Sequence, residues 1–283
     1  MTSRRSLFQD GSREAAQCRD NLNLDDSDPI SPYCVAERLG VRIRVKALDM
    51  EGTYVPEPRP RIVLSSLRPM PRRTFTVAHE LGHHVFGHGM SIDAQENAYQ
   101  AGRPVEEDLA DAFAGHLLMP AFGIRQALHV RGINRSAPSP LEIFAIASDY
   151  GVGYATLVQH LRWGLSEFGE DTAKVLLRSQ PKAIRATLIG DNNLKSLTWL
   201  DCHFRTTSVE LEVGGGLLVT GPHDHHGSAL LFEKVTAGGR LYRAVARGRS
   251  TITRGGRQTQ INVWQTDFDG DARYRALEDN DDD

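Results

Sequence analysis

Two histidines four residues apart, His79 and His83, constrain this chain more than any other feature. The residues between Pro71 and Gly87 place apolar side chains at three- and four-residue steps, which predicts a helix with one apolar face. Because residues four apart lie one above the other on a helix, both imidazoles can reach a single metal ion. Glu80 lies about a third of a turn further round, where its carboxylate can act on a water molecule without binding the ion. This His-Glu-x-x-His pattern is typical of zinc peptidases.

A catalytic zinc site needs three protein ligands and an open fourth position. In the metzincin pattern the third ligand is a His six residues after the second, but that position is Gly89 in this chain. His88 is one residue short of it. The third ligand is therefore expected elsewhere in the sequence.

Residues 105–119 predict a second helix, which Pro104 opens and Pro120 ends. The helix is apolar on nearly every side after its acidic first turn, so a carboxylate buried along it needs a partner. Glu107 and Asp111 lie one turn apart on the same face. We predict that Glu107 is the third zinc ligand and that Asp111 orients a ligand histidine through its other ring nitrogen. This order of residues is also the thermolysin-type, or gluzincin, arrangement.

The first turn of the second helix leaves alternatives open. Glu106 or Asp108 could take the place of Glu107, and the three acids could be only a charge cluster at the helix start. His116, nine residues after Glu107, points to the opposite side of the helix. It is predicted to be a hydrogen-bonded packing residue.

His84 and His88 form a further pair four residues apart, on the same helix face as Glu80. His84 could contact the substrate or stabilise the transition state. The alternative interpretation is that both histidines form a polar helix edge. Tyr99, between the two helices, is another candidate donor to the substrate.

Taken together, the segments FTVAHELGHHVFGH (75–88) and EEDLADAFAGHLLMP (106–120) resemble the ImmA/IrrE family of metallopeptidases. Residues 33–41 look like the opening helix of that family, and residues 43–45 and 61–65 look like its strands before the zinc helix. The resemblance covers about residues 30–165.

The resemblance implies that His79, His83 and Glu107 are the metal ligands and that Glu80 is the catalytic base. Asp111 stands where the family often has Asn, and an aspartate can make the same hydrogen bond. Zn²⁺ is the expected cofactor, although a shell of two histidines and a glutamate also accepts Mn²⁺. The implied function is that of an intracellular endopeptidase that cleaves an XRE-type helix-turn-helix repressor and thereby derepresses stress-response or mobile-element genes.

Composition narrows the class of protein. The chain has 283 residues, of which 40% are hydrophobic, and a net charge of −3, so no general attraction to nucleic acid or anionic membrane is expected. No apolar run approaches the roughly 20 residues of a membrane span, and no secretory signal is expected at the start of the chain. Cys18, Cys34 and Cys202 are too few and too widely spaced for a disulfide framework. A cytoplasmic protein is the simplest interpretation.

The predicted fold class is α+β. It comprises a mainly helical zincin-like catalytic domain with a small sheet, then a helix-turn-helix-like helical segment, then a β-rich C-terminal domain. The predicted regions are a flexible leader (1–28) that could hold a short helix near Arg13–Arg19, the metallopeptidase domain (29–135), the helical segment (136–190), the β-rich domain (191–276) and an acidic disordered tail (277–283). The connection at 89–104 could hold a short helix or a mobile flap.

Residues 141–152 and 154–163 have the outline of a helix-turn-helix, which raises the alternative of a DNA-binding regulator with a structural or sensory zinc. The second of these helices carries only Arg162 near its end and no base-reading Arg or Lys at its start. Direct DNA binding is therefore not expected. A catalytically silent binding module is a further alternative.

The alternation of Val209, Leu211 and Val213, and the Gly-rich turns that follow, predict a small antiparallel β domain. Within it, the segment His223-Asp224-His225-His226 could hold a second metal. No other ligand is spaced to complete a shell, so a solvated loop is predicted.

Overall fold

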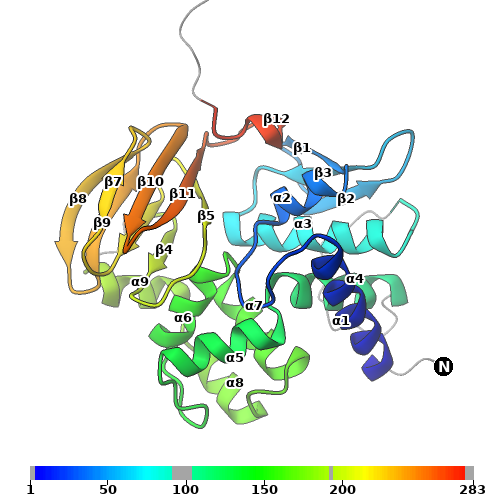
Figure 1. Cartoon of the computed structure of the whole chain (residues 1–283), viewed down its shortest axis with the longest axis horizontal. Coiled ribbons are helices and arrows are strands. Elements are labelled where there is room, and N and C mark those ends of the chain that lie inside the picture. Colours follow the sequence, from blue (N-terminus) through cyan, green and yellow to red (C-terminus); the bar gives the residue numbers. More distant parts are fainter. Residues whose placement is uncertain (1–3, 91–103, 191–193, 278–283) are drawn as a thin grey trace, which may run out of the picture. The chain divides into compact units, whose positions relative to one another are not determined.

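The computed structural model describes residues 4–90, 104–190 and 194–277 (Figure 1). Over these residues the chain forms a mixed α/β fold of helices and three four-stranded sheets, which confirms the predicted fold class at that level. It divides into two compact units, Met1–Ile124 with Asp267–Ala272 and Arg125–Thr266 with Arg273–Asp283. The domain boundaries drawn from the sequence stay predictions.

The first unit contains a small mixed sheet with the strand order β12-β1-β3-β2. β1 pairs with β3 in parallel, whereas β2 pairs antiparallel with β3 and β12 antiparallel with β1. The strands are β1 (Arg42–Lys46), β2 (Gly52–Val55), β3 (Arg61–Ser65) and β12 (Gly270–Asp271), and helix α2 (Pro32–Arg38) precedes them. The helix and the two strands expected before the motif are present, and β2 is an element that the sequence did not indicate.

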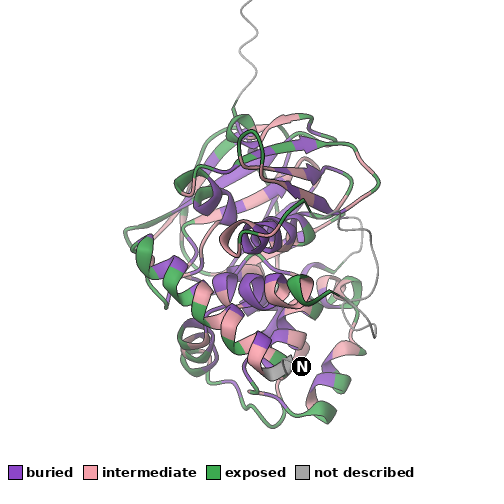
Figure 2. Cartoon of the chain, turned by 90° about the vertical axis from the view of Figure 1, so that its right-hand side faces the viewer, coloured by how far each residue is buried: buried purple, intermediate pink, exposed green. Residues whose placement is uncertain are grey.

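Helices α3 (Met70–Val85) and α4 (Val105–Leu118) pack against each other. The small sheet lies on one side of α3 and α4 on the other (Figure 1). Most residues of α3 are buried, as the purple ribbon at the centre of Figure 2 shows. Pro71 stands in the first turn of α3, and Gly87, just beyond its end, has a φ of +66°, which suits glycine at a helix terminus. Both helix boundaries agree with the prediction.

The N-terminal segment differs from its prediction. Instead of a flexible leader, Arg4–Asn21 form helix α1, which packs on α4. Its buried stripe recurs every three or four residues and consists largely of small side chains: Leu7, Gly11, Ala15 and Cys18. Such a stripe is too weakly apolar to stand out in a polar sequence, and only the facing helix makes it a packing surface.

Arg19 joins α1 to the end of α4 and to the segment at 25–28 through hydrogen bonds and an ion pair. Its side chain is fully buried and donates to the backbone oxygen of Leu117 at 2.7 Å. The guanidinium also pairs with Asp26 at 3.0 Å and donates to the backbone oxygens of Asp25 and Asp28. A buried guanidinium with this many acceptors ties the segment at 25–28 to the end of α4.

The second unit begins within α5 (Ala121–Val130) and continues as a run of short helices. These are α6 (Pro140–Asp149), α7 (Tyr154–Gln159), a π-helical turn (His160–Gly164), α8 (Glu170–Leu177) and α9 (Pro181–Ile189). α6 and α7 occupy the two predicted helices of the helix-turn-helix outline. That these helices form a helix-turn-helix stays a prediction.

Two four-stranded sheets follow, with the orders β5-β11-β10-β7 and β4-β6-β9-β8. Their strands are β4 (Leu197–Leu200), β5 (Ser208–Glu212), β6 (Gly216–Val219), β7 (Asp224–His226), β8 (Leu230–Thr236), β9 (Gly239–Ala244), β10 (Gly248–Arg254) and β11 (Arg257–Trp264). Buried side chains of both sheets, such as Leu217 and Ile261, form one core. The predicted antiparallel pairing is present in four strand pairs, but β4 pairs in parallel with β6 and β5 with β11, which the prediction did not include. Parallel partners far apart in sequence leave no local turn signal.

The structure bears on two further predictions, the loop that contains the histidines at 223–226 and the state of the cysteines. The segment Asp224–His226 is not a loop but strand β7, which pairs antiparallel with β10. Cys18, Cys34 and Cys202 are all free thiols, as predicted.

None of the helices in the described ranges is both long and apolar enough to cross a membrane. Residues 91–103 of the connection at 89–104, with its suggested short helix or flap, and residues 278–283 of the tail lie outside the described residues.

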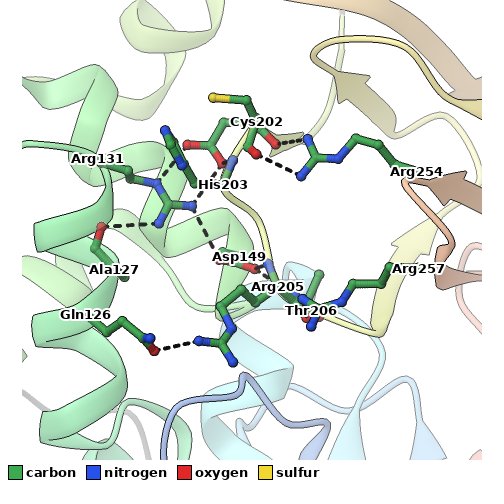
Figure 3. A network of polar contacts seen from close by, with 11 residues as sticks. Gln126, Ala127, Arg131, Asp149, Cys202, His203, Arg205, Thr206, Arg254 and Arg257 are labelled. Atoms are coloured by element: carbon green, nitrogen blue, oxygen red, sulfur yellow. Dashed lines mark hydrogen bonds and ion pairs between the residues drawn. The ribbon is translucent and has the colours of Figure 1, made fainter.

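A buried ion network joins the helices of the second unit to the loop at 201–206 (Figure 3). Arg131, directly after α5, donates to both carboxylate oxygens of Asp201, at 2.7 and 2.9 Å, and to Asp149 of α6 at 3.3 Å. Asp149 also accepts the backbone N–H groups of Arg205 and Thr206 at 2.8 and 2.9 Å. The carboxylate of Asp149 therefore holds the loop against the helices.

Candidate metal centre

Helix α3 presents three side chains of the motif from its buried length. His79, Glu80 and His83 are almost entirely shielded from solvent. α4 brings Glu107 toward the two histidines, since its acidic first turn lies beside α3. The three potential ligands therefore come from two helices, α3 (Met70–Val85) and α4 (Val105–Leu118), that are separate in sequence.

The ligand atoms of these three residues converge. Nε2 of His79 lies 3.1 Å from Nε2 of His83 and 3.2 Å from Oε2 of Glu107. Nε2 of His83 lies 3.4 Å from Oε1 of Glu107. Over the described parts of the chain, no other group of three or more His, Cys, Asp or Glu side chains is arranged to hold an ion.

These spacings fit a zinc ion. With bonds of 2.0–2.1 Å in tetrahedral geometry, ligand atoms stand about 3.3–3.4 Å apart. The two imidazole nitrogens and the carboxylate of Glu107 lie at about this separation, so three ligands from these residues would leave a fourth position open. Two nitrogens and one oxygen are a donor set that zinc accepts.

Asp111 sets the orientation of His79. Oδ1 of Asp111 lies 2.8 Å from Nδ1 of His79, and a carboxylate can only accept, so the imidazole carries its proton on Nδ1 and turns Nε2 toward Glu107. Burial lowers the pKa of His79, but the hydrogen bonds with Asp111 and Glu107 outweigh burial and raise the pKa well above its usual value. A cation at Nε2 must therefore displace a proton.

Glu107 has the charge that a ligand needs. Hydrogen bonds with His79 and His83 hold the pKa of its carboxyl far below its usual range, so the group is anionic at neutral pH. The competing acids do not share this position. Glu106 is exposed, and neither it nor Asp108 belongs to the convergent group.

Glu80 lies on a different face of α3, beneath the edge strand β2. A Cβ atom added to Gly52 of β2 would lie 2.6 Å from Cγ2 of Thr76 and 3.5 Å from Oε1 of Glu80. The lack of a side chain at Gly52 thus lets β2 lie close to the face of α3 that carries the Glu80 carboxylate.

Comparison with known proteins adds to this geometry. Residues 36–162 match a peptidase family model described as the IrrE N-terminal-like domain. This match supports the resemblance to the ImmA/IrrE family over that part of the chain. A search of curated proteins finds no significant match. The family is of the zinc metallopeptidase type, in agreement with the donor set of the two helices.

Within the matched residues 36–162, two contacts near the motif involve side chains whose partners the sequence did not indicate. The hydroxyl of Tyr54, on β2, lies 2.8 Å from Nδ1 of His84. Nδ1 of His88 lies 2.9 Å from Nδ1 of His83. His84 and His88 therefore have specific partners, instead of forming a plain polar edge. Tyr54 could not have been found from spacing, because it lies on the strand that was missed.

The remaining candidates lie apart from the centre or outside the structure. His116 is not part of the convergent group, and burial lowers its pKa to about 4. Tyr99 lies outside the described residues. His223 and His225 contact the ring of Tyr242 in the second unit, and they do not belong to a metal-binding group among the residues described.

Proposed function

We propose that this chain is a zinc-dependent endopeptidase, with His79, His83 and Glu107 as metal ligands and Glu80 as catalytic base. The observation that carries the proposal is the convergence of the two imidazole nitrogens and the Glu107 carboxylate, next to the fully buried Glu80 on the helix of the two histidines. A bound zinc ion supplies a Lewis acid that polarises the scissile carbonyl and acidifies a nearby water.

The side chains of the protein carry the proton transfers. Glu80 accepts the proton of the attacking water at its carboxylate and then delivers it to the nitrogen of the leaving amine. We assign the hydroxyl of Tyr54 as the donor to Nδ1 of His84, which leaves the His84 proton on Nε2. From there it can donate to the carbonyl oxygen of the substrate as negative charge develops.

The proposed substrate is an XRE-type helix-turn-helix repressor, whose cleavage would derepress stress-response or mobile-element genes in the cytoplasm. This part of the proposal is supported by the family resemblance alone. The decisive experiment mixes the purified zinc-loaded protein with the helix-turn-helix repressor encoded beside its gene. We expect one discrete cut, detected by mass spectrometry of the products.

Glu80→Gln is the matched variant for this experiment. It should keep the fold and the zinc content of the wild type while abolishing cleavage, because the amide cannot accept the proton. Wild-type cleavage rates in Glu80→Gln would contradict the role of Glu80. Absence of cutting by a zinc-loaded wild type, over a panel of helix-turn-helix repressors, would contradict the substrate class.

The DNA-binding alternative has little support in the region where it would act. Arg162 forms an ion pair with Glu170 at 3.1 Å, and its guanidinium lies 4.0 Å from the ring centre of Trp163. The one basic side chain near the end of the second helix is thus already engaged. A gel-shift assay at physiological salt tests this alternative, and sequence-specific retardation of DNA would favour it.

A further inference from the structure

The turn that ends α3 brings the chain back to His83, the second histidine of the motif. The N–H of Gly87 donates to the oxygen of His84 at 3.2 Å, and the N–H of His88 donates to the oxygen of His83 at 2.9 Å. These two bonds, with the positive φ of Gly87, form a Schellman motif. The backbone of His88 is therefore hydrogen-bonded to His83, and the side chains of the same two residues are also in contact.

The imidazole of His88 is held in place on its other face. Its ring stacks on Phe86, with centroids 5.5 Å apart and planes 14° apart. Phe86 in turn meets Phe113 of α4 edge-on at 6.3 Å. The ring of His88 thus lies between a ring packed on α4 and the ring of His83. Its orientation is built into the packing of the two helices.

The contact between the two imidazoles requires one donor and one acceptor. If Nε2 of neutral His83 is to offer its lone pair to a metal, the proton of that ring must be on Nδ1. Nδ1 of His83 then donates to Nδ1 of His88 at 2.9 Å, and His88 carries its own proton on Nε2. This is the same arrangement as that of His79, whose Nδ1 donates to Asp111.

We propose that His88 is the positioning residue of His83, holding the tautomer and the ring orientation that direct Nε2 toward Glu107. It acts through His83 and is not a ligand itself, because it contacts the nitrogen on the other side of the His83 ring from Nε2. The proposal rests on the proposed metal centre. It assigns to His83 a hydrogen-bond acceptor, His88, that lies outside the His-Glu-x-x-His motif.

The test is the Zn²⁺ affinity of the folded protein, measured by competition with a chromophoric chelator at fixed pH. His88→Phe keeps an aromatic ring to stack on Phe86 but removes the acceptor. We expect it to bind Zn²⁺ about 10- to 100-fold more weakly than the wild type, as is usual when such a support is lost. His88→Asn places an amide oxygen near the former Nδ1 position and should restore most of the affinity.

A spectroscopic readout accompanies the affinity. The visible spectrum of the Co²⁺-loaded protein should change in His88→Phe and return toward the wild-type spectrum in His88→Asn, because it reports the geometry of the ligands. His226→Phe, which removes an exposed histidine from β7, is the matched control and should leave both measurements unchanged.

The outcomes separate this inference from the proposed function. Wild-type protein that binds no Zn²⁺ through His79, His83 and Glu107 overturns the metal centre on which both depend. A wild type that binds Zn²⁺, with His88→Phe binding it equally well, overturns only the role of His88. Equal weakening in His88→Phe and His88→Asn also overturns that role, since the loss would then not follow the acceptor.

Discussion

Gly82 of α3 lies so close to Ala110 of α4 that a Cβ atom added to the glycine would stand 2.9 Å from the Cα atom of Ala110. The contact is one residue from His83 on one helix and one residue from Asp111 on the other. The separation of the two helices at this point therefore sets how closely the two imidazoles can approach Glu107. Gly82, inside the motif, allows this separation because a residue with a side chain would not fit between the two helices.

Gly82→Ala should consequently disturb the metal centre. The new methyl group meets backbone atoms that cannot move aside, so we expect a loss of about 1–3 kcal/mol in the free energy of unfolding, together with weaker Zn²⁺ binding. Urea unfolding and chelator competition measure the two effects. Gly89→Ala is the control, because a Cβ atom there meets nothing within 4 Å. Two variants of equal stability would show that the helices separate without cost.

Arg19→Met tests whether α1 is an integral part of the first unit. The variant leaves the buried backbone oxygen of Leu117, and those of Asp25 and Asp28, without this donor, so the free energy of unfolding should fall by about 3 kcal/mol. Arg13→Met, on the same helix but with a side chain that is 70% exposed, should change it by less than about 0.5 kcal/mol. Equal effects of the two substitutions in urea unfolding would mean that α1 does not depend on the buried guanidinium.

Asp149→Ala should be among the most damaging substitutions in the second unit (Figure 3). It removes the acceptor of the Arg205 and Thr206 N–H groups and one of the two carboxylates beside the buried Arg131. Breaking such a buried pair typically costs about 3–5 kcal/mol. Asp149→Asn keeps an acceptor oxygen and should cost less, and Glu170→Gln, at an exposed ion pair with Lys174, should cost little. A thermal unfolding series in which Ala and Asn are equivalent would refute this account.

His116 should make the protein less stable in acid. Burial lowers the pKa of His116 from 6.5 to about 4, so between these values the unfolded chain binds a proton that the folded chain does not. Stability is therefore fully present above about pH 6.5 and falls as the pH decreases toward 4, by up to about 3 kcal/mol. In His116→Phe this part of the pH dependence should vanish, leaving the contributions of all other groups. Parallel curves for the two proteins, from urea unfolding at several pH values, would contradict the assignment.

Local patterns in the sequence were enough to predict several elements of the first unit. The i, i+4 spacing of His79 and His83 and the positions of Pro71 and Gly87 defined α3, since a helix is a repeat of short-range contacts. Pro104 and Pro120 bounded α4 for the same reason. The mixed fold class also followed, because stretches of helical and alternating periodicity are both present.

Other features became visible only in three dimensions. Spacing alone left Glu106 and Asp108 as rivals of Glu107, whereas the packing of α4 on α3 brings only Glu107 to the two imidazoles. The partners of His84 and His88 were likewise not apparent, since the hydroxyl of Tyr54 reaches His84 from β2, and His88 returns to His83 through a turn.

The full N-terminal helix and the parallel strand pairs were also visible only in the tertiary structure. Residues 4–21 carry a stripe too weakly apolar to identify a helix, and its meaning depends on α4, about a hundred residues away. β5 and β11 are parallel partners across more than forty intervening residues. The sequence by itself determined which residues form the helices of the motif and which of their side chains share a face. The tertiary structure decided which acid reaches the two imidazoles, that His88 contacts His83 and that Gly82 lies against α4, because these contacts depend on helix packing and on turn geometry that no local period reveals.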